Sequence, residues 1–205
     1  MEIFNKYRII LGSQSPRRSQ LLREAGFDFS VRIIEIDECF DPSMPVEQVA
    51  EYLAVEKSKN HLPLLNPQEI VITADSVVAL DGKIYNKPES YEDAIRILSA
   101  LGGKTHQVYT GVCMTSLDKC ISFTDRADVS FSPLSIEEIE FYINKCRPYD
   151  KAGAYGIQEW IGYTKVERIN GSFATIMGLP VHLVYQRLAE WELSGAPIDN
   201  PEFLV

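Results

Sequence analysis

The chain has 205 residues, of which 45% are hydrophobic and 24% charged, as in an ordinary soluble globular protein with a substantial core. Its net charge of −9 excludes a general nucleic-acid coat, which needs a basic surface to displace counterions from phosphates. No segment reaches the ~20 apolar residues of a membrane span, and the N-terminus does not resemble a signal peptide. We expect a cytoplasmic protein without nucleic-acid or membrane partners, folded as one domain over residues 1–205.

Hydrophobic periodicity and capping residues predict helices and strands in alternation, which favours one mixed α/β fold. Asp81-Gly82 is typical of a hairpin turn, and Ser135 with Glu138 is typical of a capping box. In chain order, the predicted elements are a strand over 7–11, a helix over 16–25, a strand over 29–33, a helix over 46–60, a strand over 69–75, a hairpin of 77–80 with 83–85, a helix over 91–101, strands over 106–115 and 122–131, a helix over 135–145, a strand over 164–169 and a helix begun by Pro180.

The start of the first helix carries the wrong charge for its position. Ser15 suits an N-cap and Pro16 suits the first helical turn, where unpaired N–H groups already carry roughly half a positive charge. Arg17 and Arg18 add two guanidinium groups there. The pattern indicates a bound anion, and a phosphate chain suits both the helix end and the planar forks of arginine.

Other charged residues lie where an α/β protein binds ligands. Asp75 is predicted at the carboxyl end of a buried strand, although aspartate is also frequent in turns. Lys57 prolongs a core-facing stripe and must reach solvent or an anion, and Lys87 lies in a loop fixed by Pro88. The acidic segment 35–41 is either a solvated loop or the source of an oxygen ligand for a divalent cation.

Several other reaction types are disfavoured by the sequence. The four cysteines have no C-x-x-C pair, so we expect buried or half-buried thiols. His61 and His182 fit structural roles at helix ends, His106 fits either role, and none suggests a catalytic triad. The chain has no Walker motif, and the small residues of 150–158 fit either a tight turn or a close approach to a ligand. The residues themselves therefore favour a metal-dependent nucleotide phosphohydrolase.

Five motifs resemble those of the Maf family of nucleoside triphosphate pyrophosphatases, once called septum formation proteins. Each is weak alone, but their order and spacing over about residues 8–188 are specific. The motifs are Ser13-Gln-Ser-Pro-Arg-Arg18, Thr73-Ala-Asp-Ser76, Lys87-Pro88, His106-Gln-Val-Tyr-Thr-Gly111 and Asp150-Lys-Ala-Gly-Ala-Tyr-Gly-Ile-Gln158.

The resemblance implies an inosine-triphosphatase-like (Maf/Ham1) fold, with a mixed, bent sheet, flanking helices and two lobes around a cleft. It also implies hydrolysis of dTTP, UTP or modified pyrimidine nucleotides to the monophosphate and pyrophosphate, with Mg²⁺, Mn²⁺ or Co²⁺. A house-cleaning role, a link to cell-division arrest and a homodimer are candidate properties. By role, the implied residues are Asp75, Lys57 and Lys87 for catalysis; Ser13, Arg17, Arg18, Glu38, Ser76 and Gln158 for substrate binding; and Glu38 and Asp75 for the metal.

Within the substrate-binding group, the family sets its base preference at the positions of Arg17, Ser76 and Gln158. Three departures from the pattern bear on this preference. Ser76 replaces a threonine, so we expect a similar preference with altered tightness. Asn86 replaces the usual glycine before Lys87, and Glu159-Trp160 replaces the glycine after Gln158. The indole of Trp160 is expected either to stack on a base or to pack in the core.

Three other functions remain open at this stage. One is the family branch that acts on 7-methyl-GTP, and another is a nucleotide-binding regulator of septum formation that does not cleave its ligand. Asp75 argues against the regulator, because a sensor has no need of a water-activating carboxylate. A phosphatase that releases orthophosphate would form different products from the same substrate.

Overall fold

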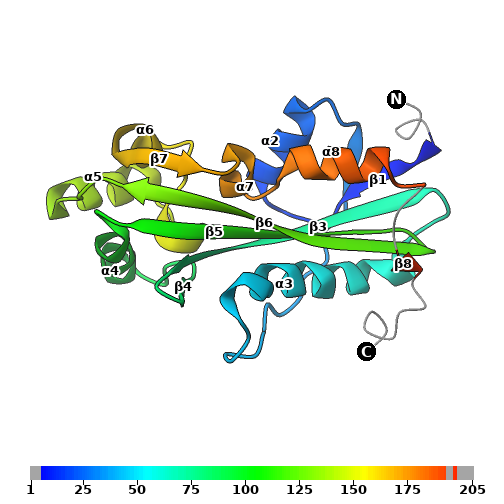
Figure 1. The fold of residues 1–205 in the computed structure, drawn as a ribbon, viewed down its shortest axis with the longest axis horizontal. Helices are drawn as coiled ribbons and strands as arrows, with labels where there is room; N and C mark the ends of the chain where they lie inside the picture. The colour runs from blue at the N-terminus through cyan, green and yellow to red at the C-terminus, as the bar shows by residue number, and fades with distance from the viewer. Residues whose placement is uncertain (1–5, 193–195, 198–205) are drawn as a thin grey trace. The chain divides into compact units, whose positions relative to one another are not determined.

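The structure, a computed structural model, describes residues 6–192 and 196–197 (Figure 1). In chain order, the elements are β1 (Arg8–Leu11), α2 (Pro16–Glu24), β2 (Phe29–Val31), α3 (Val46–His61), η1 (Leu62–Leu64), β3 (Glu69–Leu80), β4 (Lys83–Tyr85), α4 (Tyr91–Leu101), β5 (Thr105–Thr115), β6 (Lys119–Phe131), α5 (Ile136–Cys146), η2 (Ala152–Ala154), α6 (Trp160–Lys165), β7 (Val166–Asn170), α7 (Phe173–Met177), α8 (Val181–Ala189) and β8 (Ala196–Pro197).

The chain forms two compact units and crosses between them four times. The first unit contains the described residues of Met1–Asp75, Thr110–Asp125 and Gly178–Val205, and the second contains Ser76–Tyr109 and Arg126–Met177. Strands β3, β5 and β6 each contribute residues to both units. Neither unit is a continuous stretch of sequence, so each is assembled from segments that are distant along the chain.

Within the described residues, eight strands form one mixed sheet in the order β2-β1-β3-β5-β6-β7, with β4 paired to β3 and β8 to β6. Strand β1 runs parallel to β2 and β3, and Ile9 lies opposite Phe29 and Ile70. Strands β4, β7 and β8 run antiparallel to their partners. The mixed α/β fold predicted from the residue patterns, and the mixed sheet with flanking helices implied by the resemblance, are therefore confirmed.

In the first unit, successive side chains of β3 point to opposite faces of the sheet and contact different helices on each face. Ile72 is buried in a cluster with Leu22 of α2 and Leu188 of α8, and these two helices lie on one side of the sheet (Figure 1). Thr73 faces the other side, where its hydroxyl donates to the carbonyl oxygen of Ala54 in α3, at 2.7 Å. Strand β3 thus holds α3 through a polar contact and the other helices through apolar packing.

Helix α3 lies unusually close to β5 because of Gly111. A Cβ built on Gly111 would lie 2.2 Å from both the carbonyl carbon of Ala50 and the amide nitrogen of Glu51. The Glu51 carboxylate also accepts hydrogen bonds from Ser122 and Thr124 of β6, at 2.7 and 2.8 Å. The glycine of the fourth sequence motif therefore allows the helix backbone to touch the sheet.

In the second unit, side-chain caps define the starts of α4 and α5. Ser90 accepts from the amide of Asp93 at the start of α4. Ser135 and Glu138 form the predicted capping box of α5. In the same unit His106 is buried and hydrogen-bonds to the hydroxyl of Tyr155, at 2.9 Å. Burial lowers the pKa of His106 to about 4, so the ring is neutral at pH 7.

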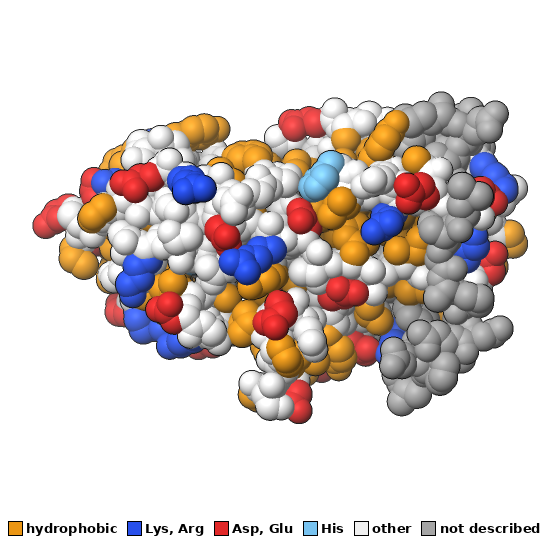
Figure 2. Space-filling model, in the orientation of Figure 1, with side chains coloured by type: hydrophobic (Ala, Val, Ile, Leu, Met, Phe, Trp, Pro, Cys, Tyr) orange, Lys and Arg blue, Asp and Glu red, His pale blue; other side chains and the backbone are white. Residues whose placement is uncertain are grey.

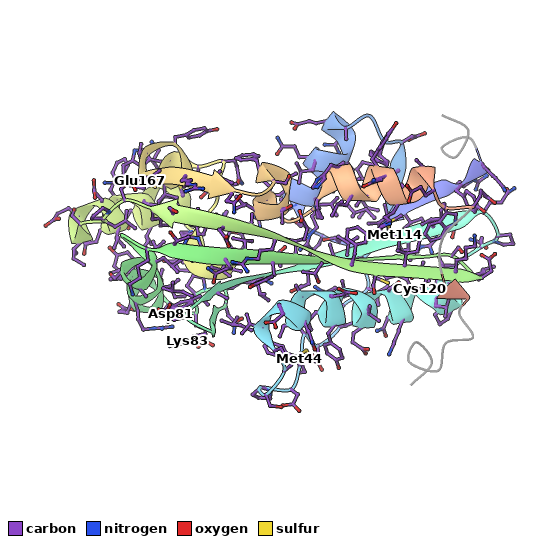
Figure 3. All side chains as sticks on the ribbon, viewed as in Figure 1. Met44, Asp81, Lys83, Met114, Cys120 and Glu167 are labelled. Carbon is purple, nitrogen blue, oxygen red and sulfur yellow. The ribbon has the colours of Figure 1, made fainter. Side chains whose placement is uncertain are left out.

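Several predicted boundaries are wrong. The predicted strand 69–75 and the first strand of the predicted hairpin form one continuous strand, β3. Its last residues Val78–Leu80 are buried and pair with β4 as the hairpin prediction requires. Figure 3 shows Asp81 at the turn of this hairpin. The region 164–169 begins as helix α6, and only Val166–Asn170 forms a strand. The short helices α6 and α7 escaped prediction because five or six residues show too little periodicity.

The cysteines are free thiols, as expected. Cys39 is nevertheless exposed rather than buried, since it lies in the irregular acidic segment. Cys113 and Cys120 lie on neighbouring strands with their sulfur atoms 3.5 Å apart, a closeness that their spacing does not reveal. None of the helices within the described residues has the length and apolar character needed to cross a membrane.

The contact at Gly111 predicts a strong steric effect. We expect Gly111→Ala to lower the free energy of unfolding by about 3 kcal/mol, because the new methyl group would meet backbone atoms that cannot rotate away. Urea unfolding measures this change. Gly102→Ala is the matched control, with its nearest contact a Leu134 side-chain atom at 3.2 Å. An equal loss in both variants would contradict the steric explanation.

Candidate active site

The first unit joins three of the predicted site residues in one charge cluster. The Lys57 ammonium on α3 donates to Asp75 Oδ1 at 2.5 Å and to Glu38 Oε1 at 2.7 Å. The side chains of Lys57 and Asp75 are 14% and 12% exposed, whereas that of Glu38 is 43% exposed. The lysine thus bridges a nearly buried carboxylate and a solvent-facing one.

Asp75 occupies the middle of a strand rather than its end, which corrects the prediction. Every other residue of β3 except Ser76 is buried, and Asp75 itself is 8% exposed. A carboxylate in such a place requires a partner, because burying an unpaired charge is costly. Lys57 supplies that partner, and so the core-facing lysine meets an anion within the protein.

The start of α2 is organised by Ser13 rather than by Ser15. Ser15 takes the N-cap position and Pro16 the first turn, but the Ser15 side chain makes no cap hydrogen bond, contrary to the prediction. Instead, the Ser13 hydroxyl oxygen accepts from the Ser15 amide at 3.2 Å and from Arg18 Nη1 at 3.1 Å. The hydroxyl of Ser13 thereby links the loop before α2 to the start of the helix and orients the guanidinium of Arg18.

Arg18 is held within this cluster of charges. Its Nε donates to the carbonyl oxygen of Gly178 at 2.8 Å. Burial lowers the pKa of Arg18, and the charge of Arg17 lowers it further. The negative charges of Asp75 and Glu38 act in the opposite direction. The arginines are half-buried. An anion bound between them would relieve their mutual repulsion.

His61 supports the loop that precedes α2. It is buried at the end of α3, one turn after Lys57, and a Cβ on Gly12 would lie 2.8 Å from its Nε2 atom. Burial lowers the pKa of His61, and Arg32 lowers it further. The ring is therefore neutral at pH 7 and packs under the backbone that leads to Ser13, in agreement with the structural role predicted for it.

The remaining predicted site residues belong to the second unit. Ser76 directly follows Asp75 and is half-buried, and Lys87 is exposed after β4. The Oε1 atom of Gln158 is buried and has no hydrogen-bond partner within the described residues. Trp160 is half-buried and packs edge-on against the exposed ring of Phe141, with ring centroids 5.1 Å apart.

Few side chains near this charge cluster could coordinate a metal ion. Within residues 6–192 and 196–197, no three His, Cys, Asp or Glu side chains gather as a metal site. Glu38 and Asp75 share Lys57 as a partner, so two hard oxygen donors lie near one another. Mg²⁺ commonly binds one or two carboxylates and completes its shell with substrate phosphates and water. The residues fit an ion of that kind, bound together with substrate.

One polar network of the second unit was missed by sequence reasoning. The ammonium of Lys151, a residue only 8% exposed, lies 3.1 Å from a Glu159 carboxylate oxygen, and the Tyr142 hydroxyl donates to the other oxygen of that carboxylate. The signal available was a lysine among small residues, with an acidic residue eight positions later. On the face that Figure 2 shows, acidic and basic side chains are intermixed.

The first unit thus defines an α/β protein in which an arginine-bearing helix start adjoins a lysine-bridged pair of carboxylates. The model of the family described as "Maf-like protein" matches residues 8–191. The chain therefore belongs to the Maf family, as its five motifs suggest.

Curated relatives support this membership over nearly the whole chain. A Bacteroides thetaiotaomicron protein named dTTP/UTP pyrophosphatase is 48% identical, with 90% of this chain and 96% of the relative covered. A Porphyromonas gingivalis protein of the same name is 44% identical, with 93% and 98% covered. Among solved structures, the Staphylococcus aureus Ham1 protein has a TM-score of 0.46 and 19% identity, over 61% of this chain and 72% of that chain.

The helix start predicts binding of a short polyphosphate. We expect Arg17→Gln to weaken binding of inorganic pyrophosphate about tenfold or more, because a hydrogen bond to a charged group contributes about 1.5–3 kcal/mol. Isothermal titration calorimetry measures the affinity. Arg23→Gln removes an exposed arginine from the far end of the same helix and should leave it unchanged. Equal affinity in all three proteins would contradict an anion site at the start of α2.

Proposed function

We propose that this Maf protein hydrolyses dTTP and UTP between the α and β phosphates, releasing a nucleoside monophosphate and pyrophosphate. The observation that carries the proposal is the Lys57 bridge between Asp75 and Glu38, in the same unit as the two arginines of α2. Such a site combines cations for a phosphate chain with a carboxylate base. The names of the relatives support the choice of substrate.

Arg17, Arg18 and the N–H groups at the start of α2 are assigned to the phosphate chain. A helix start presents several donors to an anion at once, and each guanidinium adds a fork that matches two phosphate oxygens. Ser13 keeps Arg18 aimed through its hydroxyl. We assign Lys87 and Lys57 to neutralising the charge that develops on the departing pyrophosphate.

Asp75 is assigned to the attacking water. Lys57 binds its Oδ1 atom, and we assign the other carboxylate oxygen to accepting the proton of the water as it attacks the α-phosphorus. A divalent ion held by Glu38, Asp75 and phosphate oxygens would polarise the phosphoryl group.

Base choice is assigned to Arg17, Ser76 and Gln158. The buried, unpartnered Oε1 of Gln158 is an acceptor suited to an N–H donor such as the imide of uracil or thymine. Ser76 offers a hydroxyl that is a methyl group smaller than threonine. We treat residues 1–205 as one functional domain, since neither compact unit is continuous in sequence.

A nucleotide panel with product analysis tests the proposed reaction. We expect dTTP and UTP to be hydrolysed faster than CTP, GTP or 7-methyl-GTP, to a monophosphate and pyrophosphate. EDTA should stop turnover, and added Mg²⁺, Mn²⁺ or Co²⁺ should restore it. Ion-exchange chromatography with ³¹P NMR identifies the products. A diphosphate with orthophosphate, or a preference for 7-methyl-GTP, would overturn the assignment.

Asp75→Asn tests the proposed base. We expect kcat for dTTP to fall by about 10²- to 10⁴-fold, the usual contribution of a general base. Binding of an analogue with a methylene group between the α and β phosphorus atoms should change little. Asp128→Asn is the matched control, because Asp128 pairs with Arg126 at the surface. Unchanged turnover in Asp75→Asn would exclude this residue as the base.

A further inference from the structure

The segment that carries Gln158 is a tight turn. The amide of Glu159 donates to the carbonyl oxygen of Gly156 at 3.0 Å, which closes a four-residue turn with Ile157 and Gln158 at its centre. Ile157 is 4% exposed, so one central side chain is anchored in the interior. The direction of the Gln158 carboxamide therefore depends on how firmly the two ends of the turn are held.

One hydroxyl holds both ends of this turn. Tyr142 of α5 accepts a hydrogen bond from the amide of Gly156 at 2.9 Å and donates one to the carboxylate of Glu159. Burial and the nearby carboxylate raise the pKa of Tyr142, so the hydroxyl keeps its proton and remains a donor. A Cβ on Gly156 would lie 2.8 Å from the Glu159 carboxyl carbon, so a larger residue at 156 would displace the Glu159 carboxylate from this position.

The charge of Glu159 is also balanced, and its backbone begins the next helix. Lys151 Nζ lies 3.1 Å from Glu159 Oε1 and 2.7 Å from Asp150 Oδ1. The carbonyl oxygen of Glu159 accepts from the amides of Gly162 and Tyr163, at 3.0 and 3.2 Å, which fixes the first turn of α6. Glu159 is thus held by its side chain, its amide and its carbonyl group.

We propose that Tyr142 and Glu159 are positioning residues that clamp the turn at 156–159 and thereby set the nucleotide preference expressed through Gln158. The inference rests on the proposed function, because it assigns a cause to the base preference of that enzyme. The Glu159 carboxylate, which accepts the hydrogen bond of the Tyr142 hydroxyl, belongs to the residue that directly follows Gln158.

A clamp of this kind affects the discrimination between nucleotide bases more than the rate of the hydrolysis step. An acceptor held in one direction favours a base that presents an N–H there, because with any other base the buried acceptor stays without a hydrogen bond. Releasing the turn lets the carboxamide rotate toward other donors or acceptors. The expected signature is a smaller ratio of kcat/KM for dTTP to kcat/KM for CTP, caused mainly by a higher KM for dTTP.

Tyr142→Phe and Glu159→Gln test the clamp in the full-length protein. We expect each variant to lower the dTTP-to-CTP ratio of kcat/KM about tenfold, while kcat for dTTP changes less than threefold. Tyr163→Phe and Glu167→Gln are the matched controls, since Tyr163 is 78% exposed and Glu167 lies exposed on β7 (Figure 3). Both controls should keep the wild-type ratio.

A double-variant cycle separates positioning from a general loss of stability. Gln158→Ala alone should lower the ratio, and adding Tyr142→Phe to it should lower the ratio no further, because the clamp acts through Gln158. Additive losses, or a fall in thermal stability with an unchanged ratio, would overturn the inference. Wild-type protein that hydrolyses neither dTTP nor UTP would instead overturn the proposed function.

Discussion

A charged carboxylate in the middle of a buried strand is the constraint on which the first unit depends. Asp75 is tolerable there only if a cation reaches it among the packed side chains, and Lys57 is such a cation. For the Lys57 ammonium to reach Asp75, α3 must keep a fixed position and rotation against β3. Thr73 holds the helix from β3, and Gly111 admits its backbone against β5. The chemistry of one residue therefore dictates the packing of a whole layer.

The sequence predicted most of the elements because their signals are local. The capping box at Ser135 and the Asp81-Gly82 turn need only a few neighbouring residues to be recognised, and both are confirmed. The prediction that Asp75 ends its strand was wrong, because the strand continues past Ser76 into the residues that pair with β4. The polar side chain of Ser76 makes this continuation look like a break in the apolar pattern. The Ser13 contact with Arg18 was missed because its geometry depends on the path of a loop.

The site residues likewise divide into those recognisable from local sequence signals and those brought together only by the fold. The arginines at the start of α2 were recognisable because their charge conflicts with the local helix dipole. The bridge from Lys57 to Glu38 joins residues 19 positions apart through an irregular segment, and no periodicity encodes it. In the second unit, Lys151 and Glu159 are unremarkable charges in sequence, and only the fold pairs them with each other and gives Glu159 a hydrogen-bond donor on α5. Sequence motifs thus identify groups that touch substrate better than groups that aim them.

The passage of the chain between the two units also limits how the protein can change. Three of the four crossings fall inside strands β3, β5 and β6 rather than in loops. Exchanging one unit for that of a relative would therefore require joints within hydrogen-bonded strands, where a one-residue error turns every later side chain to the opposite face. New nucleotide preferences in this chain should accordingly arise by point substitution, and recombination at the unit boundaries should yield few folded chimeras.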